Sequence, residues 1–116
     1  MGNEADLGVG QTAKDQYQHL HDTLARARET CTDLQARQRL RQEAETVQAV
    51  LTAMDQADMA SRTSKFEEVA VQVDSVNSSM DKLKAEIAVI IQDVGIAEKV
   101  VGAIDSAIAA SAKLLS

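Results

Sequence analysis

Apolar and small residues recur through the second half of the chain at alternating steps of three and four positions. This heptad spacing is typical of a helix that buries one seam along its whole length. The seam keeps its phase through Gly95 and Gly102, so we expect one continuous helix with at most a bend at Gly95. The seam comprises Phe66, Val69, Val73, Val76, Met80, Leu83, Ile87, Ile90, Val94, Ala97, Val101, Ile104, Ile108, Ser111 and Leu115.

A shorter seam of the same kind begins at Tyr17 in the first half of the chain. It loses phase and resumes one position early at Leu40, which rotates the buried stripe by about 100°. Thr32 stands just before this slip and, with Gln35 three residues later, fits the capping box that opens a new helix. The pattern predicts a first helical arm from about Thr12 to Asp58, kinked or broken near Thr32.

Small and polar residues interrupt the seams between the two halves of the chain. Ser64 and Glu67 then match a second capping box, directly before the long seam. We therefore expect a tight turn at 59–64, followed by a second helical arm from Ser64 to Leu115.

The first residues of the chain stand outside this pattern. Residues 1–11 contain three glycines and show no periodicity, so we expect a disordered N-terminal arm there. Residues 12–116 are long enough to form a single helical domain with its own core. Proline is absent and no glycine stands between Gly10 and Gly95, which favours long helices.

We expect an all-α fold, an antiparallel hairpin of two long helices with the first kinked near Thr32. The segment 85–91 is apolar on most of its circumference, whereas a two-helix hairpin buries only one face of each helix. Two hairpins that pair as a homodimer would complete a four-helix bundle; a compact monomeric four-helix bundle, with turns near Thr32 and Gly95, is the alternative. The predicted interface residues are Phe66, Val73, Met80, Ile87, Val89, Ile90, Ile91, Val94, Val101, Gly102, Ile104, Ser106 and Ala110.

Charge and composition narrow the class of partner. The chain has a net charge of −6, only 2% aromatic residues, and no basic half. Because nucleic-acid binding relies on lysine, arginine and stacking aromatics, we expect no nucleic-acid partner. No export signal or long apolar run is visible, so cytoplasmic residence is the default expectation, with signal-less secretion left open. One arginine patch alternates with acidic residues, as on a solvated helix face; it comprises Arg26, Arg28, Arg37, Arg39 and Arg41.

Two groups of residues offer candidate chemistry, and we interpret both as structural. Asp15, His19 and Asp22 share one helix face, but they supply three metal ligands at most. His21 points away from that face, so we expect no metal and no cofactor. Cys31 lies on the first seam, where a thiol behaves as a small apolar group and has no nearby base. Nucleotide-binding, metalloprotease and nucleophile motifs are absent from the sequence, so we expect no enzyme.

Three hypotheses of function remain. The leading one is a non-enzymatic helical interaction or assembly protein (a structural coiled coil, adaptor or small helical chaperone) that binds a second copy or another helical protein through its seam. The alternative is a membrane-active or secreted helical protein that uses the amphipathic segment Gly95–Ser116. Membrane contact is disfavoured because Glu98 and Asp105 offset the lysines of that segment. A metal-dependent enzyme built on His19 comes last.

Overall fold

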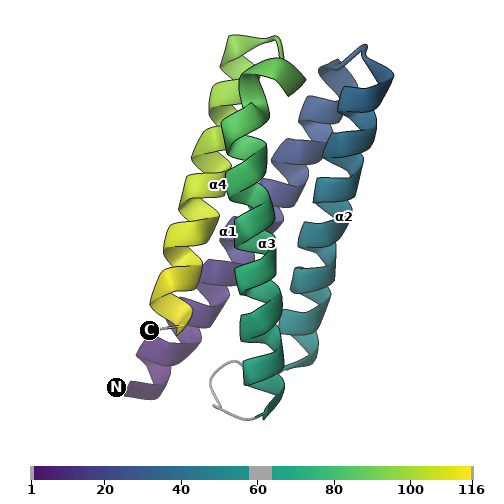
Figure 1. Ribbon diagram of the computed structural model, residues 1–116. Helices are drawn as coiled ribbons and strands as arrows, with labels where there is room; N and C mark the ends of the chain where they lie inside the picture. The colour runs from purple at the N-terminus through teal and green to yellow at the C-terminus, as the bar shows by residue number, and fades with distance from the viewer. Residues whose placement is uncertain (1, 58–63, 116) are drawn as a thin grey trace.

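The computed structural model describes residues 2–57 and 64–115, with side-chain surroundings from residue 12 onward. Four helices account for nearly all of this part of the chain, and it contains no strand (Figure 1). The all-α prediction is confirmed. The helices are α1 (Gly2–Thr30), α2 (Leu34–Gln56), α3 (Ser64–Ile90) and α4 (Val94–Leu115).

The predicted hairpin of two long helices is wrong, because the chain reverses twice more. Each extra reversal takes three residues and ends at an aspartate that caps the next helix. Asp33 Oδ2 accepts a hydrogen bond from the backbone N–H of Ala36 at 2.9 Å. Asp93 Oδ1 accepts one from Ile96 N–H at 3.1 Å, which opens α4 before Gly95 is reached. The kink expected near Thr32 is thus a complete break, and a second break lies at residues 91–93 rather than at Gly95.

The resulting body is compact, with principal extents of 47 × 22 × 20 Å and a radius of gyration of 14.6 Å. A continuous second arm would be about 75 Å long, so these dimensions exclude it. The four-helix alternative describes the architecture of the chain. Association with a second copy stays a prediction.

Two boundary predictions fall partly outside the described residues. α3 begins at Ser64, as the capping box predicts, while residues 58–63 of the turn lie outside the described part. α1 begins at Gly2 and so includes positions assigned to a disordered arm. No side-chain surroundings are described for residues 1–11, and the disorder of that arm stays a prediction.

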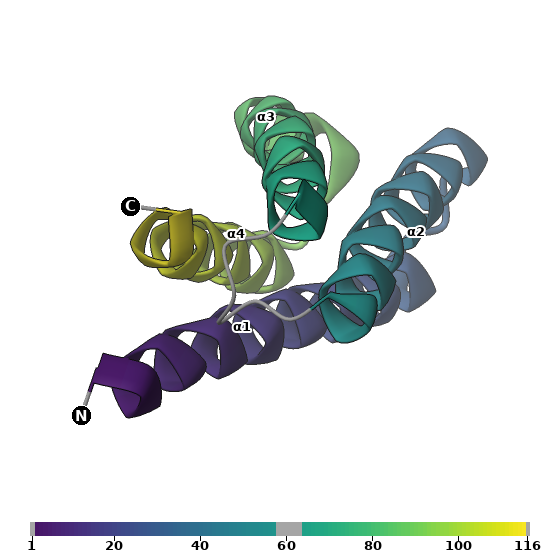
Figure 2. The same ribbon diagram turned by 90° about the horizontal axis from the view of Figure 1, so that it is seen from below.

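Both short connections lie at the same end of the bundle (Figure 1). They touch, since the Cys31 thiol lies 3.9 Å from the carbonyl oxygen of Ile90. Seen along its axis, the bundle places α1 and α3 on opposite corners, with α2 and α4 between them (Figure 2). The backbone of α1 comes close to those of α2 and α4 at many positions, whereas the backbone of α3 comes close to the same two helices at far fewer. α1 is therefore the most closely packed helix of the fold.

The two hairpins, α1–α2 and α3–α4, bury side chains at corresponding positions 60 residues apart. The capping residues Asp33 and Asp93 correspond in this way, and so do Tyr17 and Asn77, which hydrogen-bond each other. Very few of the corresponding residues are identical, so the repeat is one of burial and not of sequence. Corresponding positions that are buried in both α2 and α4 include Leu40 and Val100, Val47 and Ala107, Val50 and Ala110, and Met54 and Leu114.

The buried face of α4 is rotated from the predicted seam. In α3 the seam is correct, because Phe66 to Leu83 are buried at heptad spacing. In α4, Val101, Ile108 and Leu115 are only half-buried, because the reversal at 91–93 sets a new helix phase. The buried residues of α4 are Val100, Ala103, Ile104, Ala107, Ala110, Ser111 and Leu114.

Candidate functional site: the surface around α4

The predicted interface residues divide into three groups by exposure in the folded chain. Six are buried in the core of the chain itself: Phe66, Val73, Met80, Ile91, Ile104 and Ala110. Three are half-buried: Ile87, Ile90 and Val101. Four are exposed: Val89, Val94, Gly102 and Ser106. Only the last two groups reach the surface of the bundle, and they gather where α3 ends and along α4.

An apolar groove of about 410 Å³ runs between the end of α3 and the start of α4. Val89 and Val94, on either side of the connection, are 86% and 69% exposed. Both are exposed because they occupy the outer face of the last turn of α3 and the first position of α4. We call this surface the α3/α4 groove; it is lined by Ile87, Ala88, Ile91, Gln92, Val94, Ala97, Glu98, Val101 and Gly102.

A second groove, of about 850 Å³, lies on the other side of α4, where that helix packs on α1. Gly102 lines both grooves, and a Cβ at this position would meet no described atom within 4 Å. Around Gly102, in the middle of α4, the helix surface is therefore not covered by neighbouring side chains. We call this second surface the α1/α4 groove; its lining is Gln16, His19, Thr23, Arg26, Ala27, Thr30, Ile96, Lys99, Gly102, Ala103 and Ser106.

Small residues explain why α1 and α4 approach closely beneath the second groove. Ala27 on α1 and Ala103 and Ala107 on α4 are almost fully buried. Side chains of one carbon allow two helix backbones to come near each other. Of the small residues of α4 that were predicted as interface residues, Ala110 is buried within the chain itself, whereas Gly102 and Ser106 are exposed.

Beneath this surface, a buried polar network links three helices. The Tyr17 hydroxyl donates to Asn77 Oδ1 at 2.5 Å, and Asn77 Nδ2 donates to Ser111 Oγ at 2.9 Å. Ser111 Oγ in turn donates to the carbonyl of Ile108 at 2.8 Å. Burial raises the pKa of Tyr17 above its ordinary value of 10.0, so the phenol stays protonated. The network is structural, and Asn77 escaped the sequence analysis because one amide in a polar stretch gives no signal.

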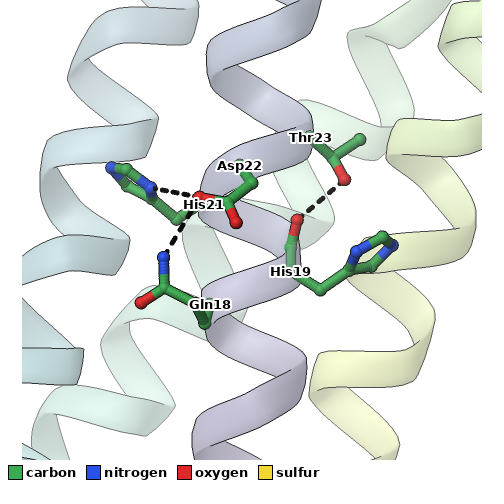
Figure 3. Close-up of polar contacts among 5 residues, drawn as sticks. All are labelled: Gln18, His19, His21, Asp22 and Thr23. Carbon is green, nitrogen blue, oxygen red and sulfur yellow. Dashed lines mark hydrogen bonds and ion pairs between the residues drawn. The ribbon is translucent and has the colours of Figure 1, made fainter.

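The candidate metal ligands do not converge. His19 extends toward α4, while His21 and Asp22 lie on the other side of α1 (Figure 3). Asp22 Oδ1 lies 3.2 Å from His21 Nδ1 and accepts a hydrogen bond from Gln18 at 3.1 Å. These contacts, His21 foremost, lower the pKa of Asp22. Within the described residues, no three histidine, cysteine or acidic side chains could hold a metal ion together.

The arginine patch splits between two environments. Arg39 contacts Glu43 at 3.4 Å and Glu86 at 2.7 Å, and Arg41 contacts Glu45 at 3.2 Å. These pairs belong to the mixed, solvated face that the sequence indicates. Arg26, by contrast, lines the α1/α4 groove.

Glu43 is the one described acidic side chain with a buried oxygen, Oε2, that has no hydrogen-bond partner. Burial raises the pKa of its carboxyl group, and the neighbouring Arg39 offsets only part of that effect. Its position corresponds to buried Ala103 in the second hairpin. Glu43 is consequently a point of weakness in α2.

Cys31 lies in the connection between α1 and α2 and not within a helical seam. Its side chain is half-buried and unpaired with another cysteine. Its Sγ atom lies 3.9 Å from the carbonyl oxygen of Ile90. No histidine, lysine or arginine, the groups that would favour a thiolate, is among the described residues that line the small pocket beside it.

No described helix combines the length and apolar character that crossing a membrane requires. Comparison of the chain with protein-family models, with curated proteins and with solved structures finds no match.

Proposed function

We propose that this chain is a non-enzymatic helical interaction protein that binds a second copy of itself through the α3/α4 groove. The observation that supports the proposal is the exposure of Val94, which is 69% exposed and lines a groove of about 410 Å³. Contiguous exposed apolar surface is typical of protein interfaces. The other residues that line this groove are also mostly apolar or small.

A second copy suits this surface because of its charge. The chain carries a net charge of −6, so most pairs of faces would repel each other. Among the residues that line the α3/α4 groove, Glu98 is the sole ionisable one. A symmetric contact brings the same patch of both copies together, and a patch with a single acidic residue meets itself with less like-charge repulsion than the more acidic faces of the chain would.

The membrane-active alternative has less support. A surface-bound helix lays its apolar side into the lipid. In the bundle, the most apolar side of α4 faces inward, with Val100, Ile104 and Leu114 buried. Membrane contact would require this helix to leave the core.

Sedimentation equilibrium tests the proposal directly. We expect the wild-type chain to dimerise, and the substitution Val94→Gln to raise the dissociation constant about tenfold, because a symmetric interface loses two apolar side chains. Val94 is exposed, so the variant should keep its helical circular dichroism and its melting temperature.

Val71→Gln is the matched control, since Val71 is 71% exposed but lies on α3 away from the groove. It should dimerise like the wild type. A wild-type chain that stays monomeric at all concentrations would overturn self-association, and an equal loss in Val71→Gln would show that the α3/α4 groove is not the interface.

A further inference from the structure

The α1/α4 groove has the volume of a ligand site and a floor of small side chains. Its volume of about 850 Å³ falls within the range of small-molecule sites, roughly 300–1,000 Å³. Ala27 and Ala103 form part of its floor and are buried, and Gly102 contributes no side chain. The floor therefore offers a small, largely apolar surface on which a flat or elongated body can lie.

Every ionisable residue that lines this groove is basic. Arg26 and His19 come from the α1 wall and Lys99 from the α4 wall, and no described acidic residue is among the lining. The chain as a whole has 18 acidic residues and only 12 lysines and arginines. The local charge is thus opposite in sign to that of the whole chain.

The two strong cations are not committed to partners within the described chain. Lys14, Arg39, Arg41 and Lys84 each contact a carboxylate, at Asp55, Glu43, Glu45 and Asp105 respectively. Arg26 and Lys99 make no such ion pair within the described residues. Asp22, one turn before Arg26, is hydrogen-bonded to Gln18 and lies 3.2 Å from His21 Nδ1. The charge of Arg26 is the smallest of the influences that lower the pKa of Asp22, and the two side chains form no ion pair.

Some polar side chains of the groove already donate hydrogen bonds within the chain, and others could bind a ligand. Thr23 Oγ1 donates to the carbonyl of His19 at 2.7 Å, and Thr30 Oγ1 donates to that of Ala27 at 2.8 Å. The hydroxyl hydrogen of each threonine is therefore already donated within its own helix. Gln16 and Ser106 remain as neutral groups able to hydrogen-bond a polar head.

We propose that the α1/α4 groove binds a small amphipathic anion, with its head between Arg26 and Lys99 and its apolar body over Ala27, Gly102 and Ala103. A carboxylate or sulfonate head answers two cations from opposite walls. An apolar body fits the floor, where its burial removes apolar surface from water. This site lies across α4 from the α3/α4 groove and shares only Gly102 with it, so the proposal does not rest on the proposed self-association.

Titration of isotope-labelled protein with decanoate, followed by amide chemical shifts, tests the proposal. We expect saturable shifts centred on Thr23, Arg26, Lys99 and Gly102. Decyltrimethylammonium, a cation with the same alkyl chain, should bind at least about tenfold more weakly, because its head is repelled by the groove.

Paired substitutions assign the binding to the groove. Arg26→Gln with Lys99→Gln should weaken decanoate binding about tenfold or more, whereas Arg28→Gln with Lys82→Gln removes the same charge elsewhere and should change it less than about twofold. Gly102→Leu should also weaken binding, because it fills an open part of the groove where a Cβ meets nothing. Circular dichroism checks that each variant stays folded.

Three results would overturn the proposal. The first is an absence of saturable decanoate binding to the wild-type chain. The second is equal binding of the cationic and anionic amphiphiles, or equal loss in both pairs of glutamine variants, since either would show that Arg26 and Lys99 do not select the head. The third is a set of shifts centred on Val94 and Ala97, which would place the alkyl chain in the α3/α4 groove instead.

Discussion

The two hairpins of this bundle share a plan and differ in how closely they are held. Each consists of two helices joined by three residues, and each caps its second helix with an aspartate, Asp33 or Asp93. Yet the backbone of α1 comes close to both of its neighbours at many positions, while that of α3 does so at far fewer. The two hairpins therefore bury corresponding positions and yet differ in the distance between their helices. That distance depends on the size of the side chains at the contact.

Substitution of corresponding core residues should give the largest difference between the hairpins. Leu20 and Met80 are both fully buried and lie 60 positions apart. We expect Leu20→Ala to lower the free energy of unfolding by about 3–5 kcal/mol and Met80→Ala by about 2–3 kcal/mol, because α3 can shift to fill a cavity more readily than α1 can. Urea denaturation measures both values. A larger loss at Met80 would contradict the contrast between the two helices.

The polar network that joins the hairpins should give the next largest effect. Tyr17→Phe leaves the Asn77 carbonyl oxygen without its donor, and we expect a loss of about 1–2 kcal/mol. A double-mutant cycle with Asn77→Ala measures the coupling, which should be a substantial part of that loss. Additive effects of the two substitutions would show that this hydrogen bond contributes nothing specific.

The two capping aspartates should contribute equally to stability, although the two hairpins are packed differently. Asp33→Ala and Asp93→Ala each remove one side-chain acceptor at a helix start. We expect both to cost about 1 kcal/mol in thermal unfolding, since capping depends on the local backbone and not on how closely the helix is packed. Costs that differ by more than about twofold would show that the two connections are not equivalent.

Glu43 gives the smallest expected effect, and one that depends on pH. The pKa of its carboxyl group is raised in the folded chain, so folding favours the protonated form. Its contribution to stability is therefore intact below the ordinary pKa of glutamate and declines as pH rises through the raised value. We expect Glu43→Gln to stabilise the chain by less than about 1 kcal/mol at pH 7, and to make no difference in acid.

The measurement is the melting temperature of the wild-type chain and of Glu43→Gln, taken at a series of pH values from acid to pH 7. The pH-independent contributions cancel when the two curves are subtracted. A stabilisation that persists unchanged at low pH would mean that the ionisation of Glu43 is not its cause.

Local sequence signals predict the start of α3 and its buried face correctly. Ser64 begins the helix, and Phe66 to Leu83 are buried at the expected spacing. The break near Thr32 was also visible, because the seam changes phase there. These features depend on caps and periodicity, both of which are encoded within a few neighbouring residues.

The reversal between α3 and α4 could not be predicted from caps and periodicity in the same way. The heptad spacing continues through residues 91–93 by coincidence, so periodicity gave no sign that α4 turns back. Asp93, whose side chain caps α4, was the available local signal, but a single aspartate within an unbroken apolar pattern does not stand out. Once the chain reverses, contact with α1 decides the buried face of α4, and that choice of neighbour is tertiary information.

The grooves that form the candidate sites depend on the same tertiary choice. Val94 and Gly102 were predicted as interface residues and do lie at the surface. His19, Arg26 and Lys99 come from two helices far apart in sequence, and nothing local indicates that they line one groove. Their common setting follows only from the antiparallel contact between α1 and α4.

The position of Tyr17 also determines how this molecule can be observed. The chain has one tyrosine and no tryptophan, so its intrinsic fluorescence and near-ultraviolet dichroism arise almost wholly from a single phenol ring. That ring is fully buried on α1 and reaches α3 through Asn77, which itself donates to Ser111 on α4. An optical signal from one residue thus reports whether both hairpins are assembled, while far-ultraviolet dichroism would register helices whether they are docked or not. Divergence of the two signals during unfolding would reveal a state in which helices persist after the hairpins have separated.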